Sequence, residues 1–99
     1  MITFTKTANT DGARFEAALV YAREIAAHGK TLTGIDTRIE MPIGGPSYRL
    51  RWVSQYQSLA ALERAITKLL SDRKYMDMAA KAPNYFVPGS ATDEVWTSV

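Results

Sequence analysis

The sequence contains no cysteine and only one histidine, and these scarcities exclude several kinds of chemistry. Without cysteine the chain can form no disulfide, no catalytic thiolate and no cysteine-type zinc site. With His28 alone, a histidine-rich metal site cannot be built either, so we expect no metal and no obligatory cofactor. The lack of cysteine suits the reducing cytoplasm, which is the location we expect.

Long apolar runs and an excess of one charge are also missing. The opening residues, MITFTKT, lack the apolar core of a secretory signal, and no stretch reaches about 18 consecutive apolar residues, so we expect neither export nor a membrane partner. The 12 Lys and Arg residues are scattered among 10 Asp and Glu residues, which gives little support to a nucleic-acid partner. The 99 residues fit a single domain spanning 1–99. A domain this small gains stability when a partner covers part of its surface.

Periodic patterns predict an alternation of strands and helices. Large side chains alternate with threonines at the start, which is the period of a strand, whereas apolar residues recur at three- and four-residue spacing in two later segments, the period of an amphipathic helix. Gly29 is expected to end the first helix, Ser58 to cap the second, and the cluster from Pro42 to Pro46 to form a hairpin turn. The expected elements are strands at 2–7, 31–41, 47–55 and 92–99, and helices from a Thr10 or Asp11 cap to Gly29, at 59–70 and at 73–82.

This order of elements is that of the α+β, ferredoxin-like βαββαβ fold, a four-stranded antiparallel sheet with its helices on one face. The third strand is expected to carry large side chains on both faces, those of Tyr48, Leu50 and Trp52 on one and those of Arg49, Arg51 and Val53 on the other. Because the face without helices would otherwise expose apolar groups, we expect it to pack against the sheet of a second copy, giving a homodimer.

The residues from Trp52 to Glu63, then Asp72 and Tyr75, and finally the segment FVPGS at 86–90, resemble the dimeric α+β barrel superfamily. The second half resembles its uncharacterised NIPSNAP-like members. This resemblance implies two sheets packed face to face in a homodimer, with a pocket in each protomer between the sheet and the helices or loops. The superfamily includes cofactor-free monooxygenases, cyclases, isomerases and heme-binding enzymes, so the fold alone does not assign a reaction. Its heme-binding members usually carry the iron-ligating histidine in the second half, which has none here, and heme is therefore not expected.

Two sets of polar residues are candidates for chemistry, each with a plainer structural interpretation. His28 is the obvious acid or base near neutral pH, but just before Gly29 it could simply interact with the C-terminus of the first helix. Arg38, Arg49 and Arg51 could grip a carboxylate or enolate through forked hydrogen bonds. The plainer interpretation is that these arginines are neutralised across strands by Asp36, Glu40 or Glu94.

Aromatic and methionine side chains are more numerous than a core of this size needs, and such side chains often line pockets for apolar ligands. The short third helix and the loop after it form the irregular part of the chain, where we expect the pocket. The candidate lining residues are Trp52, Tyr75, Met78, Tyr85 and Phe86.

Three hypotheses about function follow. The first is a homodimer that binds a small, mainly hydrophobic molecule, fatty-acid-like or aromatic, with an arginine holding any carboxylate. The second is a cofactor-independent monooxygenase, cyclase or isomerase in which His28 or a tyrosine donates or accepts a proton. The third is a structural module with a filled core.

Overall fold

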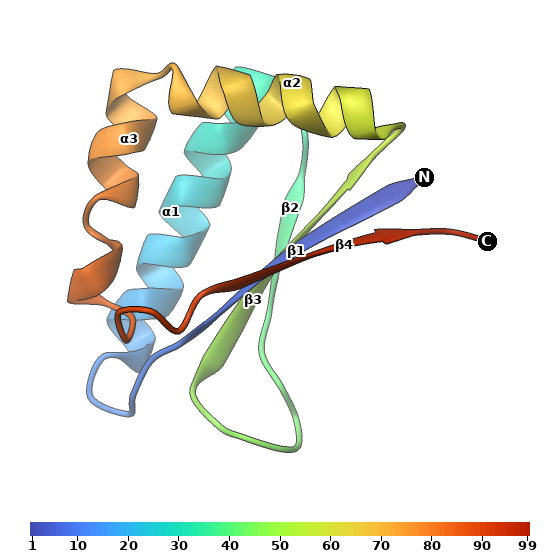
Figure 1. The fold of residues 1–99 in the computed structure, drawn as a ribbon. Coiled ribbons are helices and arrows are strands. Elements are labelled where there is room, and N and C mark those ends of the chain that lie inside the picture. Colours follow the sequence, from blue (N-terminus) through green and yellow to red (C-terminus); the bar gives the residue numbers. More distant parts are fainter.

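The computed structural model describes residues 1–99, and its elements follow the expected order. The strands form one antiparallel sheet in the spatial order β2-β3-β1-β4, and Figure 1 shows all three helices on one side of it. The fold is therefore the predicted ferredoxin-like α+β arrangement. The strands are β1 (Ile2–Asn9), β2 (Thr37–Glu40), β3 (Arg49–Tyr56) and β4 (Thr92–Thr97), and the helices are α1 (Phe15–Thr33), α2 (Leu59–Leu70), α3 (Arg73–Ala79) and a 3₁₀ turn, η1 (Ala82–Asn84).

The strand register decides which side chains face the helices. Ala8 lies opposite Leu50, and both are buried beneath α1, so the residues that alternate with them face the other way. The predicted division of β3 into two faces is confirmed. The face without helices, called the open face below, carries Thr3, Thr5, Thr7, Asn9, Arg38, Glu40, Arg49, Arg51, Val53, Gln55, Thr92, Glu94 and Trp96.

The main core lies between the sheet and α1. Leu50 at its centre is completely buried, and Ala18 and Ala22 let α1 approach the strands closely because their side chains are small. A second, smaller core lies beneath α2 and consists of Ile2, Tyr56, Leu62 and Ala65. No helix covers β4, and all six of its residues are exposed. None of the helices has the length and apolar character that crossing a membrane requires.

The first helix is longer than the sequence pattern predicts. It continues through Gly29 and ends at Gly34, which has the left-handed φ of 74° and donates its N–H to the carbonyl of Lys30. Residues 31–33, expected to open the second strand, form the last turn of α1, and β2 begins only at Thr37. The strand preference of β-branched residues is a weak effect that packing overrides here.

The expected break between the second and third helices is confirmed. The Ser58 hydroxyl caps α2 by accepting from the N–H of Ala61, and Asp72 caps α3 by accepting from the N–H of Tyr75 at 2.8 Å. The third helix ends at Ala79 rather than at residue 82. Met76 is 39% exposed because it lies off the helical stripe that faces the core.

The connection between the end of β1 and the start of α1 differs from the prediction. Thr10 is not a helix cap: its hydroxyl donates to the carbonyl of Tyr85 at 2.6 Å. Asp11 accepts from the N–H of Arg14 at 2.9 Å, just before α1 begins at Phe15. The bond from Thr10 and the bond from the N–H of Val87 to the carbonyl of Asn9 hold the segment that follows η1 against the end of β1.

Candidate functional site

An apolar cavity of about 320 Å³ lies between the helix-covered face of the sheet and the three helices. Of the 20 residues that line it, 15 are hydrophobic. Small-molecule sites in proteins typically measure about 300–1,000 Å³, so this cavity is large enough for a small ligand. The strands contribute Phe4, Lys6, Trp52, Ser54 and Tyr56, among others, and the helices contribute Tyr21, Ile25, Gly29, Ile66, Leu69 and Tyr75.

A few polar groups interrupt this apolar lining. The Ser54 hydroxyl donates to the Tyr56 hydroxyl at 3.1 Å, and Lys6 forms an ion pair with Asp93 at 2.7 Å. The Tyr75 hydroxyl, by contrast, forms no hydrogen bond with another protein group, and burial raises its pKa above the usual value. Tyr75 therefore keeps its proton at neutral pH and can donate it in a hydrogen bond to a ligand carbonyl.

Trp52 and Tyr75 are the two predicted site residues that line the cavity. Trp52 reaches it from β3, and its indole N–H donates to the carbonyl of Ala22 on α1 at 3.3 Å. Because this bond and the contact with Phe86, with ring centroids 5.4 Å apart, fix the indole, Trp52 forms a rigid wall.

Met78, Tyr85 and Phe86 are not among the lining residues; they pack around Tyr21 in the main core. The Tyr21 hydroxyl donates to the carbonyl of Met78 at 2.9 Å, and the rings of Tyr21 and Tyr85 stack with centroids 4.6 Å apart. Burial raises the pKa of Tyr21 to about 12. Met78, Tyr85 and Phe86 therefore contact Tyr21, which lines the cavity, from the side away from the cavity.

Arg38, Arg49 and Arg51 lie on the open face, on the opposite side of the sheet from the cavity. Glu40 accepts a short hydrogen bond of 2.6 Å from Arg51 and a longer one of 3.4 Å from Arg38. The bond from Arg51 lowers the pKa of Glu40 below its usual range. The pair of Arg51 and Glu40 is the cross-strand neutralisation considered above, whereas Arg38 pairs with Glu40 along the same strand and Arg49 forms no ion pair. No single chain brings these arginines and the cavity together.

His28 does not lie in the last turn of α1, so the predicted interaction with the helix C-terminus is wrong. The helix continues past it, and His28 Nε2 instead lies 2.8 Å from Asp72 Oδ2. Asp72 is also the cap of α3, so this contact connects α1 to the start of α3 and, through it, to Tyr75. His28 is not among the cavity-lining residues.

The contact between His28 and Asp72 predicts a pH-dependent stability. The hydrogen bond from His28 is the main reason why the pKa of Asp72 lies below its usual value of 3.8. A lowered pKa means that the carboxylate stabilises the fold fully above the usual value and loses this effect as the pH falls through the lowered one. Asp72→Asn keeps the cap but loses the charge, so its melting temperature is expected to lie a few degrees below that of the wild type near neutral pH.

Thermal melts at several pH values check this expectation. The difference between the wild type and Asp72→Asn should shrink as the pH falls below 3.8 and through the lowered pKa of the wild-type carboxyl, because that carboxyl then also becomes neutral. A difference that stays constant over this range would contradict the role assigned to the charge.

Most of the cavity-lining residues were not singled out from the sequence, and Lys6, Ser54 and Tyr56 are among those that carry polar groups. A signal for Lys6 was present, because it continues the alternation of Ile2 and Phe4 and is thus a cation on the apolar face of a strand. Ser54 and Tyr56 carry no such signal, since small hydroxyl and tyrosine side chains are common on either face of a sheet. No three His, Cys, Asp or Glu side chains come close enough to hold a metal ion.

No family model matches the chain, and no curated protein does. Solved structures do match it. A NIPSNAP domain protein from Burkholderia xenovorans superposes with a TM-score of 0.83 at 10% identity, over 100% of this chain and 95% of that one. A NIPSNAP family protein from Agrobacterium tumefaciens gives a TM-score of 0.80 at 15% identity, over 99% and 92%.

A proposed antibiotic biosynthesis monooxygenase from Nitrosomonas europaea also matches, with a TM-score of 0.74 at 11% identity over 100% and 99% of the two chains. At these identities the likeness concerns the fold alone. The chain thus has the ferredoxin-like fold of NIPSNAP proteins and of monooxygenase-like proteins, as the resemblance of its second half predicts.

Proposed function

We propose that this protein is a cytoplasmic homodimer that binds a small, mainly hydrophobic molecule, fatty-acid-like or aromatic, in the cavity between its sheet and its helices. The observation that carries the proposal is the cavity itself, whose lining is mostly hydrophobic and includes a tyrosine hydroxyl without a protein partner. Burial of apolar ligand surface would supply the affinity, and one donated hydrogen bond would orient the ligand.

The dimer is supported by the open face of the sheet. Trp96 is 61% exposed there, and the Thr5 hydroxyl is buried without a hydrogen-bond partner. A second sheet packed against this face would cover the indole. The ion pair between Glu40 and Arg51 lies on the same face, so these two charges would already be compensated if a dimer buried them.

Native mass spectrometry of freshly purified protein, followed by denaturing extraction, tests both parts of the proposal. We expect a dimer that carries an apolar compound, and we expect Trp96→Ser to be mostly monomeric, because exposed tryptophans are frequent hot spots in interfaces. If the wild type is a monomer, the proposed dimer is wrong. If the dimer carries no compound and no apolar compound raises its melting temperature, the cavity is not a binding site.

A second candidate is a cofactor-independent monooxygenase, cyclase or isomerase that acts on such a molecule. It is supported by Tyr75, which could stabilise a developing oxyanion by donating a hydrogen bond, and by the likeness to the proposed monooxygenase. The extracted compound distinguishes the two candidates. An enzyme should change it during aerobic incubation with fresh protein, whereas a binding protein should return it unaltered.

A further inference from the structure

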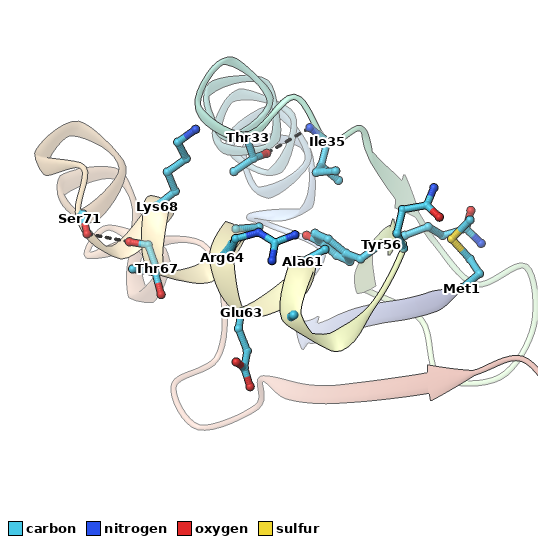
Figure 2. A pocket seen from close by; sticks show the side chains of 14 residues that line it. Met1, Thr33, Ile35, Tyr56, Ala61, Glu63, Arg64, Thr67, Lys68 and Ser71 are labelled. Atoms are coloured by element: carbon cyan, nitrogen blue, oxygen red, sulfur yellow. Dashed lines mark hydrogen bonds between the residues drawn. The ribbon is translucent and has the colours of Figure 1, made fainter.

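A second hollow adjoins the cavity. It is an open groove of about 930 Å³ along α2, and three of its 14 lining residues, Thr33, Ile35 and Tyr56, also line the cavity. In Figure 2 Thr33 and Ile35 lie across the groove from α2, whereas the Tyr56 ring lies beside Ala61 and Arg64 of α2. The two hollows are therefore adjacent, and a ligand that passes between these shared residues would lie partly in each.

The groove differs from the cavity in its charge. Arg64 and Lys68 project from α2, and Figure 2 shows Arg64 directed toward Tyr56 and Lys68 toward Thr33, while Glu63 points away from both. Neither Arg64 nor Lys68 takes part in an ion pair within the chain. Both cations are therefore available to an anion.

Two hydroxyl groups of the groove are already hydrogen-bonded within the chain. The Thr33 hydroxyl donates to the carbonyl of Gly29 at 3.0 Å and accepts from the N–H of Ile35 at 3.2 Å, and the Ser71 hydroxyl donates to the carbonyl of Thr67 at 2.7 Å. These two hydroxyls therefore already have partners, whereas the cations of Arg64 and Lys68 have no ion-pair partner in the chain.

Lys6, the cation that lines the cavity, is less suited to binding a ligand carboxylate. Lys6 is held by Asp93 at 2.7 Å, so a ligand carboxylate would have to displace the aspartate or share the lysine with it. A carboxylate inside the mostly apolar cavity would also lose its hydration with little compensation, which is costly. An anionic group is thus better placed in the open groove than in the cavity.

Resting on the proposed function, we infer that the ligand is an amphiphilic acid, bound with its carboxylate in the groove at Arg64 and Lys68 and with its apolar chain in the cavity. The chain would pass Ile35 and Tyr56, the residues common to both hollows. The guanidinium of Arg64 can hold a carboxylate by two parallel hydrogen bonds, and Lys68 adds a mobile charge.

Calorimetric titration with decanoate and with decan-1-ol, both below their aggregation limits, tests this orientation. The two probes share an apolar chain and differ in the charged group. We expect the wild type to bind decanoate about tenfold more tightly than decan-1-ol, and we expect Arg64→Gln combined with Lys68→Gln to remove this preference without changing the affinity for decan-1-ol.

Arg23→Gln combined with Lys81→Gln is the matched control, because it removes one arginine and one lysine from exposed positions outside both hollows. It should retain the preference for decanoate. If the control loses as much affinity as the groove variant, the effect is one of net charge and the inference is wrong. Equal affinity of the wild type for both probes would overturn the inference but leave the cavity function intact, whereas binding of neither probe would contradict both.

Discussion

Replacing Gly29 by leucine is expected to weaken the binding of decanoate by more than about tenfold while the protein stays folded. Gly29 lies in the interior of α1 and lines the cavity together with Leu69 and Tyr75. A Cβ atom added there would lie 3.6 Å from Leu69 Cδ2 and 3.8 Å from Tyr75 Cε2, which is ordinary van der Waals contact. The remaining atoms of a leucine would have to enter the cavity, in the volume that the ligand needs.

Gly29→Ala is the matched control for this experiment. The added methyl group fits without a clash, and alanine is favoured over glycine inside a helix by about 0.5–1 kcal/mol. This variant should therefore bind decanoate and melt at a slightly higher temperature than the wild type. If Gly29→Leu binds decanoate as the wild type does, the ligand does not occupy this cavity. Calorimetry and thermal melts of the two variants provide both measurements.

The largest loss of stability is expected for Leu50→Ala. Leu50 is completely buried on the central strand β3, where it packs against Ala8 and the residues of α1. Removing a buried leucine side chain and leaving a void costs about 2–5 kcal/mol. In a domain of this size such a loss lowers the melting temperature by more than about 10 °C.

Leu59→Ala removes the same atoms from a position that is 57% exposed, at the start of α2, and serves as the control. It should change the free energy of unfolding by less than about 1 kcal/mol. Urea titrations of both variants test the comparison. Similar losses for the two variants would mean that the core is not centred on Leu50.

The sequence predicts the sheet better than it predicts the ends of the helices. The alternation in β3 assigns its two faces correctly, since a period of two distinguishes the faces of a sheet wherever large groups lie on both. The end of α1 was misplaced because two glycines, Gly29 and Gly34, were available as stops. Only the tertiary contacts of Gly29 with α2 and α3 show that it belongs to the helix interior. The misplacement also led to the wrong role for His28.

The candidate site was predictable only in part. Trp52 and Tyr75 were found because aromatic side chains next to irregular segments often line pockets. Arg64 and Lys68 were not, because on α2 they belong to the polar side of an amphipathic helix and look like any solvated pair. Their proposed role rests on Ile35 and Tyr56, which line the same groove. This arrangement depends on contacts between segments that are distant in the sequence.

The central place of β1 in the sheet has a consequence for how the chain folds. Its two edges are occupied by β3 and β4, and Ile2 lies opposite Thr97, so the first strand pairs with the last one. Helix α1 and the hairpin of β2 and β3 can form from local contacts, whereas β1 must wait for segments that are distant in the sequence, and such pairing is slow. Until β4 arrives, one edge of β1 can pair with the strand of another molecule, so this interval is when the chain is most exposed to aggregation.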